Sequence, residues 1–253
     1  MIISLELSSY CSKGCSICSR SSGYKHLTDM NMSIATFNHI INKLPANQVI
    51  SCHGRGSSEQ NPDFEVMTRA LSRDHTLVID TNGDFLDDID YKAFATVTVS
   101  TFDEDVMWKD QLKKIIRFKD NSKNPRLLLR INGKIKDKHR MVIYKELFKD
   151  NIVHRQIHSK KGSYNYEENE PVKAEHGICL CLIGHPVIWA DGNVSTCIRY
   201  DNEQQRLLGN IILSDWDELI NSGKRMTMLK EHIKTGTSRF CGDCSYRGIP
   251  VSR

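Results

Sequence analysis

The chain has 253 residues, which corresponds to one large domain or to a medium domain with a small appendage. Its 39% hydrophobic and 26% charged residues exclude a disordered chain, and a net charge of +4 is too small to indicate a nucleic-acid groove. No apolar run approaches the ~18 residues that span a bilayer, and the N-terminus lacks the basic region of a secretory signal. We therefore expect a cytoplasmic protein without a membrane segment, and nucleic acid is not an expected partner.

From residue 2 to residue 159, short runs rich in β-branched residues alternate with stretches that have apolar residues at helical spacing. The predicted strands are Ile2–Ser8, Gln48–His53, His75–Thr81, Thr96–Thr101, Arg126–Asn132 and Asn151–Ser159. The predicted helices between them include Ile34–Leu44, Phe64–Leu71, Asp105–Phe118 and Lys138–Phe148. Six such alternations predict an α/β fold with parallel strands and crossover helices, either an open sheet or a partial barrel. In such folds the chemistry lies at the C-terminal ends of the strands.

This alternation stops at residue 160. Residues 161–178 are polar and contain an acidic patch before Pro171, so we predict a linker there. The linker would separate one domain over residues 1–160 from a second over residues 179–253.

The second domain contains a hairpin signal and a helix signal. Pro186–Ala190 and Asn193–Thr196 flank an Asp-Gly pair, which predicts a β-hairpin with a two-residue turn. Asp215–Ile233 has helical spacing and precedes the final cysteines. We expect a small domain made of this hairpin and this helix.

Nine cysteines are unusual for a cytoplasmic chain, in which disulfides do not persist, and their clustering points to metal binding. Three of them form a C-x3-C-x2-C array in the loop after the first predicted strand: Cys11, Cys15 and Cys18. Three thiolates at this spacing can hold three corners of a cubane iron–sulfur cluster and leave one corner open. The alternative is a zinc loop that takes its fourth ligand from a distant Cys or His.

The array and the segments that follow it resemble the radical S-adenosylmethionine (radical SAM) enzymes. Gly54–Asp63 is similar to their glycine-rich segment after the second strand, although Ser57 stands where the family usually has Glu. Thr81–Gly83 and Val97–Ser100 resemble the ends of the third and fourth strands, and Ile17 replaces a frequent aromatic residue. By this resemblance, the residues expected to bind the cofactor are Ile17, Gly54, Arg55, Gly56, Ser57, Asn82 and Ser100.

The resemblance implies a partial (β/α)6 TIM-like barrel and two cofactors at the first cysteine array. The three thiolates would bind a 4Fe–4S cluster, and S-adenosylmethionine (SAM) would bind its open iron. One electron from the reduced cluster would yield methionine and a 5′-deoxyadenosyl radical, which abstracts hydrogen from a small-molecule or peptide substrate. A flavodoxin- or ferredoxin-type protein is the expected electron donor.

A second set of cysteines lies near the C-terminus, in the pattern C-x17-C-x43-C-x2-C formed by Cys179, Cys197, Cys241 and Cys244. Four thiolates suit either zinc or a 4Fe–4S cluster. The segment is similar to the SPASM and twitch modules that follow a radical SAM barrel, and its spacings resemble those of 2-deoxy-scyllo-inosamine dehydrogenases. Because no further cysteine follows the final pair, the resemblance is to the twitch form, with one auxiliary 4Fe–4S cluster.

Two cysteines need separate interpretation. Cys181 competes with Cys179 for one ligand position, and we favour Cys179 because its spacing to Gly192 is the commoner one in the family. Cys52, in the second predicted strand, is expected to be a small buried hydrophobic residue.

Candidate substrate-site residues alternate along the last two predicted strands of the barrel. In the last of these strands, one face carries His154, Gln156 and His158. This face lines the barrel if the apolar residues Val153 and Ile157 face the helices. His158 and His154 are the catalytic candidates, since dehydrogenation needs a base, and the alternative is a hydrogen-bonded structural histidine.

Arg130 and Asn132 alternate onto one face of the preceding strand in the same way. Arg130 is a candidate partner for the methionine carboxylate of SAM, and the alternative is a position on a solvated edge.

The expected reaction is dehydrogenation of a small polar molecule, such as an amino sugar or a nucleoside, with the auxiliary cluster as electron acceptor. One alternative is a peptide-modifying radical SAM enzyme that forms a crosslink or an epimer. An alternative of another class is a non-catalytic zinc-binding module.

Overall fold

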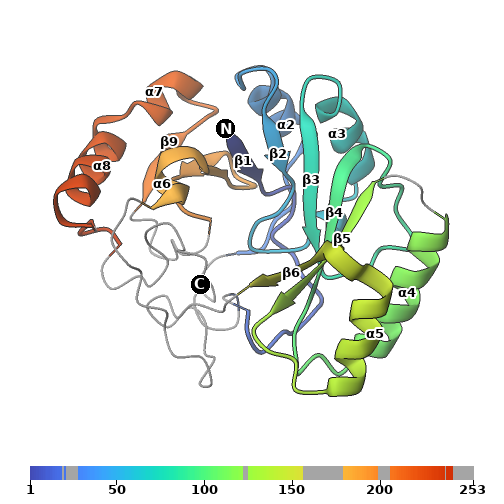
Figure 1. Ribbon diagram of the computed structural model, residues 1–253. Helices are drawn as coiled ribbons and strands as arrows, with labels where there is room; N and C mark the ends of the chain where they lie inside the picture. The colour runs from blue at the N-terminus through green and yellow to red at the C-terminus, as the bar shows by residue number, and fades with distance from the viewer. Residues whose placement is uncertain are drawn as a thin grey trace.

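The computed structural model describes residues 1–18, 20, 28–121, 125–155, 179–198, 206–236 and 238–241. The parallel strands in this part of the chain are β1 (Ile2–Leu5), β2 (Val49–Ser51), β3 (Thr76–Thr81), β4 (Phe94–Thr101), β5 (Arg126–Asn132) and β6 (Ile152–Arg155). Three further strands follow: β7 (Val187–Ile188), β8 (Asn193–Ser195) and β9 (Leu207–Asn210). Together these nine form one sheet in the order β6-β5-β4-β3-β2-β1-β7-β8-β9 (Figure 1).

Helices cover the outer face of the parallel strands (Figure 1). They are α2 (Ile34–Ile41), α3 (Phe64–Leu71), α4 (Trp108–Asn121) and α5 (Lys138–Phe148), with the 3-10 turns η1 (Ser58–Gln60) and η2 (Lys149–Asn151) beside α3 and α5. The side chains of Ser33 and Asp137 accept hydrogen bonds from the first turns of α2 and α5, which fixes where these helices begin. The predicted α/β alternation is confirmed, with one correction. Residues 82–93, which join β3 to β4 and are all described, contain turns and no helix.

The two faces of the parallel sheet differ in polarity. Toward the helices lie apolar side chains that are at most 1% exposed and form the main core, including Ile3, Ile50, Leu77, Ile79, Val97 and Leu129. On the opposite side, which we call the inner face, lie Ser4, Ser51, Asp80 and Arg130. The register supports this division, because it pairs Ser4 with Ser51 and Arg130 with Ser100. The inner face therefore offers polar side chains where the helix-facing side of these strands is mainly apolar.

The C-terminal part of the chain continues the same sheet. β7 pairs in parallel with β1, and the predicted hairpin is present as β7 and β8, with Gly192 in its turn at φ +82. A third antiparallel strand, β9, was not expected from the sequence. α6 (Leu180–Gly184) precedes β7. The predicted linker, residues 161–178, lies outside the described residues.

The helix predicted over Asp215–Ile233 is in fact two helices, α7 (Trp216–Ile220) and α8 (Gly223–Thr235). The break lies at Ser222, whose hydroxyl accepts a hydrogen bond from the Arg225 N–H at 3.4 Å and caps α8. Such a cap favours a new helix start over continuation, so the apolar spacing alone was misleading. None of the described helices has the length and hydropathy needed to cross a membrane.

One buried ion pair connects β1, the loop after β2 and the start of the C-terminal part. Glu6 is fully buried, and its carboxylate accepts hydrogen bonds from the Arg55 N–H at 2.6 Å and from Arg55 Nη2 at 2.5 Å. The same carboxylate accepts a hydrogen bond from the Ala190 N–H at 3.3 Å. The Arg55 guanidinium lies over the Trp189 ring, 4.9 Å from its centre. Three segments distant in sequence therefore meet at one pair of charges.

Removing one member of this pair should destabilise the fold strongly. Glu6→Ala leaves the Arg55 charge buried without its partner, so we expect the free energy of unfolding to fall by about 3–5 kcal/mol in urea denaturation. The control is the exposed pair Asp90–Lys92, in which Asp90→Ala is expected to cost less than about 1 kcal/mol. Equal losses in the two variants would contradict a structural role for the buried pair.

Candidate active site

The first cysteine array lies in the loop that follows β1, at the C-terminal edge of the parallel sheet. Cys11, Cys15 and Cys18 are all partly exposed, and a tight turn joins the last two through a 3.1 Å hydrogen bond from the Cys18 N–H to the Cys15 carbonyl. Burial raises the pKa of each thiol, that of Cys15 to about 12, and the three thiols lie close enough to influence one another electrostatically. The loop thus gathers three protonated thiols that a soft metal would have to deprotonate.

The fit of an iron–sulfur cluster to this loop rests on its donor set. Three soft sulfur donors in eight residues suit three corners of a cubane cluster, and one apolar wall is provided by Ile17 against Phe102. Across the described residues, no group of three His, Cys, Asp or Glu side chains is already arranged around a metal position. The thiols would therefore turn toward a cluster on binding it.

An ion pair also holds the cysteine loop in place. Lys13 lies between the first two cysteines, and its ammonium is 2.8 Å from the carboxylate of Asp105, which is 2% exposed. Asp105 belongs to the connection after β4, so this pair anchors the cysteine loop to the neighbouring strand end. Pairing at such low exposure fixes the position of the loop more firmly than a surface pair would.

The glycine-rich segment after β2 packs directly against the chain that leads into the cysteine loop. A side chain at Gly56 would come within 2.3–2.5 Å of the backbone of Ser9 and Tyr10, and one at Gly54 would come within 2.4 Å of Glu6. Only glycine allows this approach, and the Ser57 N–H completes it by donating to the Tyr10 carbonyl at 2.7 Å. The structure thus brings the predicted SAM-binding segment, residues 54–57, next to the cysteine array.

Two other predicted cofactor-binding residues, Asn82 and Ser100, lie at the ends of β3 and β4. Their carbonyl oxygens both accept hydrogen bonds from the Gln111 amide of α4, at 2.6 and 3.0 Å. The Asn82 Nδ2 is buried and has no hydrogen-bond partner in the described part of the chain. A buried donor left unpaired is costly, so this atom is a reason to expect a polar ligand beside the cysteine loop.

The inner face carries a group of charged and polar side chains from several strands. Arg130 donates a hydrogen bond to Asp80, whose other near neighbour, His53 Nε2, is 4.0 Å away. His53 Nδ1 is 2.7 Å from Ser51 Oγ, and the ring of His185 meets the His53 ring edge to face at 6.4 Å. His53, Asp80 and Arg130 are each about one-fifth exposed, so they are accessible to a ligand.

Electrostatics fixes the charge state of this group. Burial lowers the pKa of His53 to about 4 and also lowers the pKa of His185, so both imidazoles are neutral at pH 7. Burial opposes the ionisation of Asp80, but the positive charges around it, which include the Arg130 and Arg155 guanidinium groups, outweigh it and lower the pKa of the carboxyl. The inner face therefore offers a carboxylate, two neutral imidazoles and two guanidinium groups.

Three of the C-terminal cysteines lie within electrostatic range of one another. Burial raises the pKa of Cys241 to about 11, and the neighbouring thiols that influence it are Cys179 and Cys197, although they lie 62 and 44 residues earlier in the chain. Cys181 is buried in α6, and Cys244, the fourth predicted ligand, lies outside the described residues. Soft thiol donors from distant segments that lie within electrostatic range of one another suit a soft metal or a cluster, although the described residues do not already surround a metal position.

Comparison with solved structures gives the identity of the fold. The chain is similar to selenomethionine BtrN in an open conformation, with a TM-score of 0.56 and 17% identity over 96% of this chain and 91% of that one. It is also similar to Streptococcus suis SuiB bound to SAM, with a TM-score of 0.65 and 14% identity over 96% and 70% of the two chains. A second SuiB structure matches with a TM-score of 0.54 and 13% identity, over 90% of this chain and 67% of that one.

BtrN and SuiB are radical SAM enzymes. The fold of this chain matches the folds of these enzymes. The comparisons confirm the predicted α/β class, the partial barrel and the hairpin that follows it. No protein-family model matches the sequence, and no curated protein matches it at a significant level.

Of the two predicted catalytic histidines, the structure describes His154 only. The register pairs His154 with Ile131, on the side of the sheet that faces the helices, and His154 is exposed there. The expectation that His154 lines the barrel is therefore corrected, and Val153 and Arg155 occupy the inner side instead. Periodicity could not settle the face, because β6 is an edge strand with both faces partly open. His158 and Gln156 lie outside the described residues.

Two other expectations concern Arg130 and Cys52. Arg130 lies on the inner face and forms an ion pair with Asp80, which accounts for its position. It is therefore not on a solvated edge, and its predicted contact with the SAM carboxylate stays a prediction. Cys52 is fully buried in the main core, as predicted.

The sequence patterns did not single out Glu59, which lies two residues beyond Ser57. Its buried carboxylate accepts hydrogen bonds from the Ser57 hydroxyl at 2.9 Å and the Tyr91 hydroxyl at 3.2 Å, and burial raises its pKa. Asp80, His53 and His185 were also not singled out as site residues. Only the sequence segment His53–Gly56 marked this strand end as polar.

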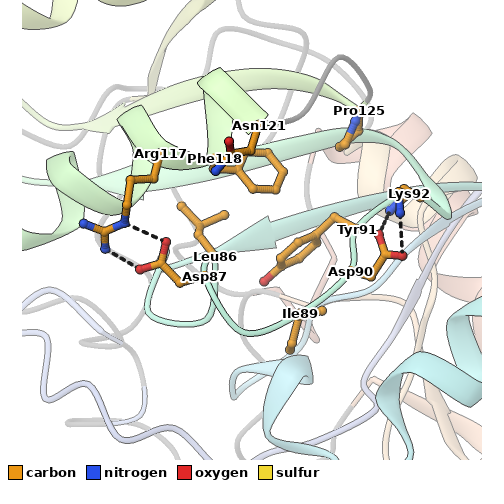
Figure 2. Close-up of a pocket in the computed structure, with 10 residues that line it drawn as sticks. All are labelled: Leu86, Asp87, Ile89, Asp90, Tyr91, Lys92, Arg117, Phe118, Asn121 and Pro125. Carbon is orange, nitrogen blue, oxygen red and sulfur yellow. Dashed lines mark hydrogen bonds and ion pairs between the residues drawn. The ribbon is translucent and has the colours of Figure 1, made fainter.

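A cavity of about 570 Å³ lies at the opposite end of the parallel strands from the cysteine loop, between residues 86–92 and the end of α4 (Figure 2). Its floor is apolar, with Leu86, Ile89 and Phe118, and the ion pairs Arg117–Asp87 and Lys92–Asp90 lie at its rim. Asn121 and Pro125 place this cavity at the N-terminal end of β5, away from the cysteine loop. It does not belong to the site described above.

The lowered pKa of His53 should appear as a pH dependence of stability. The unfolded chain binds a proton at His53 below its ordinary pKa of about 6.5, whereas the folded protein does so only near pH 4, so unfolding becomes easier as the pH falls through this window. Between pH 7 and pH 5, His53→Gln should lose less of its free energy of unfolding than the wild type does. The exposed His139→Gln should behave like the wild type. Identical pH slopes for the wild type and His53→Gln would contradict the buried neutral state.

Proposed function

We propose that the protein is a radical SAM enzyme that dehydrogenates a small polar substrate. One observation carries the proposal: in a radical SAM fold, a three-cysteine loop lies at the C-terminal edge of β1, against the glycine segment 54–57. Cys11, Cys15 and Cys18 would hold a 4Fe–4S cluster, and Gly54–Ser57 together with Asn82 would hold SAM beside it. The unpartnered Asn82 Nδ2 supports this assignment.

The C-terminal thiols support an oxidative outcome. Cys179 and Cys197 lie within electrostatic range of Cys241, and with Cys244 these three would supply the ligands of an auxiliary 4Fe–4S cluster. When bound, the first cluster would supply the electron that cleaves SAM to methionine and a 5′-deoxyadenosyl radical, and the auxiliary cluster would accept one electron from the substrate. The protein supplies orientation, exclusion of water and a place for the proton that is released.

The inner face supports a small polar substrate over an apolar one. Asp80 is held ionised by Arg130, and neutral His53 faces it across 4.0 Å, a gap too long for a direct hydrogen bond. A substrate hydroxyl in this gap would donate to Asp80 and accept from the His53 Nε2–H. When the substrate is oxidised, Asp80 is placed to take the hydroxyl proton. We also propose that a flavodoxin- or ferredoxin-type protein delivers the first electron.

Metal content and SAM cleavage test this proposal together. Wild-type protein purified anaerobically should contain about eight iron atoms per chain and should form 5′-deoxyadenosine from SAM after reduction with dithionite. Cys15→Ala should contain about four iron atoms and form none, because one corner of the SAM-binding cluster loses its ligand. Cys52→Ala, which removes a thiol from the core instead, should keep both properties.

Other outcomes separate the alternatives. About four iron atoms in the wild type, with 5′-deoxyadenosine still formed, would contradict the auxiliary cluster and leave the oxidation without an electron acceptor. Bound zinc without SAM cleavage would contradict the enzyme assignment and favour a non-catalytic zinc-binding protein.

A further inference from the structure

The sulfur of Cys241 is in contact with an imidazole and a guanidinium group that come from different elements, and the imidazole can donate to it once the sulfur is a thiolate ligand. His232, in the last turns of α8, has its Nε2 3.4 Å from the Cys241 sulfur and is only 2% exposed. Arg206, just before β9, hydrogen-bonds the same thiol and is 4% exposed. Neither residue belongs to the cysteine pattern, and both lie beside the group of thiols already described.

The local backbone holds Cys241 against His232. α8 ends at Gly236, which adopts φ +71 and donates its N–H to the His232 carbonyl at 2.9 Å, so the chain turns back along the helix. The Ser238 hydroxyl then donates to the carboxylate of Glu231 at 2.6 Å, and the Cys241 N–H donates to the Ser238 carbonyl at 2.8 Å. The His232–Cys241 contact is therefore a product of the helix ending.

Arg206 is held just as firmly. Its guanidinium donates a hydrogen bond to the Phe240 carbonyl at 2.5 Å, next to Cys241 in the chain. A fixed positive charge and a buried imidazole thus converge on one sulfur. Buried polar groups normally have hydrogen-bond partners, and the partner that His232 and Arg206 share is a predicted cluster ligand.

Donors aimed at a ligand sulfur change the energetics of an iron–sulfur cluster. A hydrogen bond to a cysteine thiolate withdraws electron density from it, and a nearby cation favours the state with one more electron. Both effects stabilise the reduced cluster relative to the oxidised one and so raise its reduction potential. A higher potential makes a cluster a better electron acceptor.

We propose that His232 and Arg206 raise the reduction potential of an auxiliary cluster bound through Cys241, so that it accepts the electron released by the substrate radical. This inference rests on the proposed function, because it assumes that the C-terminal thiols bind a 4Fe–4S cluster. It assigns roles to two residues outside the ligand set, as groups that tune the cluster.

The full chain with Cys11→Ala, Cys15→Ala and Cys18→Ala isolates the auxiliary cluster for measurement. After anaerobic reconstitution, its midpoint potential is read from a redox titration followed by electron paramagnetic resonance. Adding His232→Leu should lower the midpoint potential of the cluster by about 59 mV. At the midpoint potential of the parent variant, the ratio of reduced to oxidised cluster would then be about tenfold lower. His232→Gln, whose amide can still donate a hydrogen bond, should recover part of this shift. His139→Leu, on the exposed side of α5, should leave the potential unchanged.

The outcomes distinguish the inference from the function beneath it. A triple variant that assembles no cluster would overturn the auxiliary cluster of the proposed function, and the inference with it. A cluster that assembles with the same potential in all His232 variants would overturn the inference alone. If His232→Leu does not assemble a cluster, His232→Gln and Arg206→Gln replace it. A potential unmoved in both of these would be equally decisive against the inference.

Discussion

The buried pair of Glu6 and Arg55 is the constraint on which the site depends. Glu6 follows directly after β1 in the chain that leads to the cysteine loop, and Arg55 lies between the two glycines of the segment after β2. Because the pair is nearly free of solvent, its two charges must stay together, and the segments that carry them must stay together as well. The close approaches at Gly54 and Gly56 are the steric side of the same arrangement.

The pair also explains how the C-terminal part is attached. Trp189 lies under the Arg55 guanidinium, and the Ala190 N–H donates to Glu6, so the turn of the β-hairpin is bound to the same two charges. β7 then adds to β1 in parallel, which makes the barrel strands and the hairpin one continuous sheet. The first cysteine array follows β1, and Cys179 and Cys197 lie before and after the hairpin that continues the sheet from β1.

Sequence periodicity predicted most of the fold because buried parallel strands and amphipathic helices have distinct patterns. Phe64–Leu71, Arg126–Asn132 and Lys138–Phe148 were predicted at the residues where the structure has them. Periodicity failed where local or edge effects decide. The Ser222 cap divides a stretch whose apolar spacing is continuous, and His154 lies on an edge strand where neither face is fully buried.

The candidate site could be predicted only as far as its chemistry is local in sequence. The three cysteines and the glycine segment share short stretches of chain, so their spacing was informative. The Asp80–His53 group and the His232–Cys241 contact join residues whose proximity is set by strand register and by a helix ending. Nothing in the spacing of these residues distinguishes them from ordinary polar positions.

The central claim is that the cysteine loop after β1 holds a cluster to which SAM binds directly. Electron–nuclear double resonance on the reduced variant that combines Cys179→Ala, Cys197→Ala and Cys241→Ala, in which only the first array keeps three cysteines, tests it with SAM labelled with ¹⁵N in its amino group. The account predicts a cluster signal that changes on addition of SAM and shows coupling to the labelled nitrogen. A reduced cluster whose signal is indifferent to SAM, or the absence of any cluster in this variant, would contradict the account.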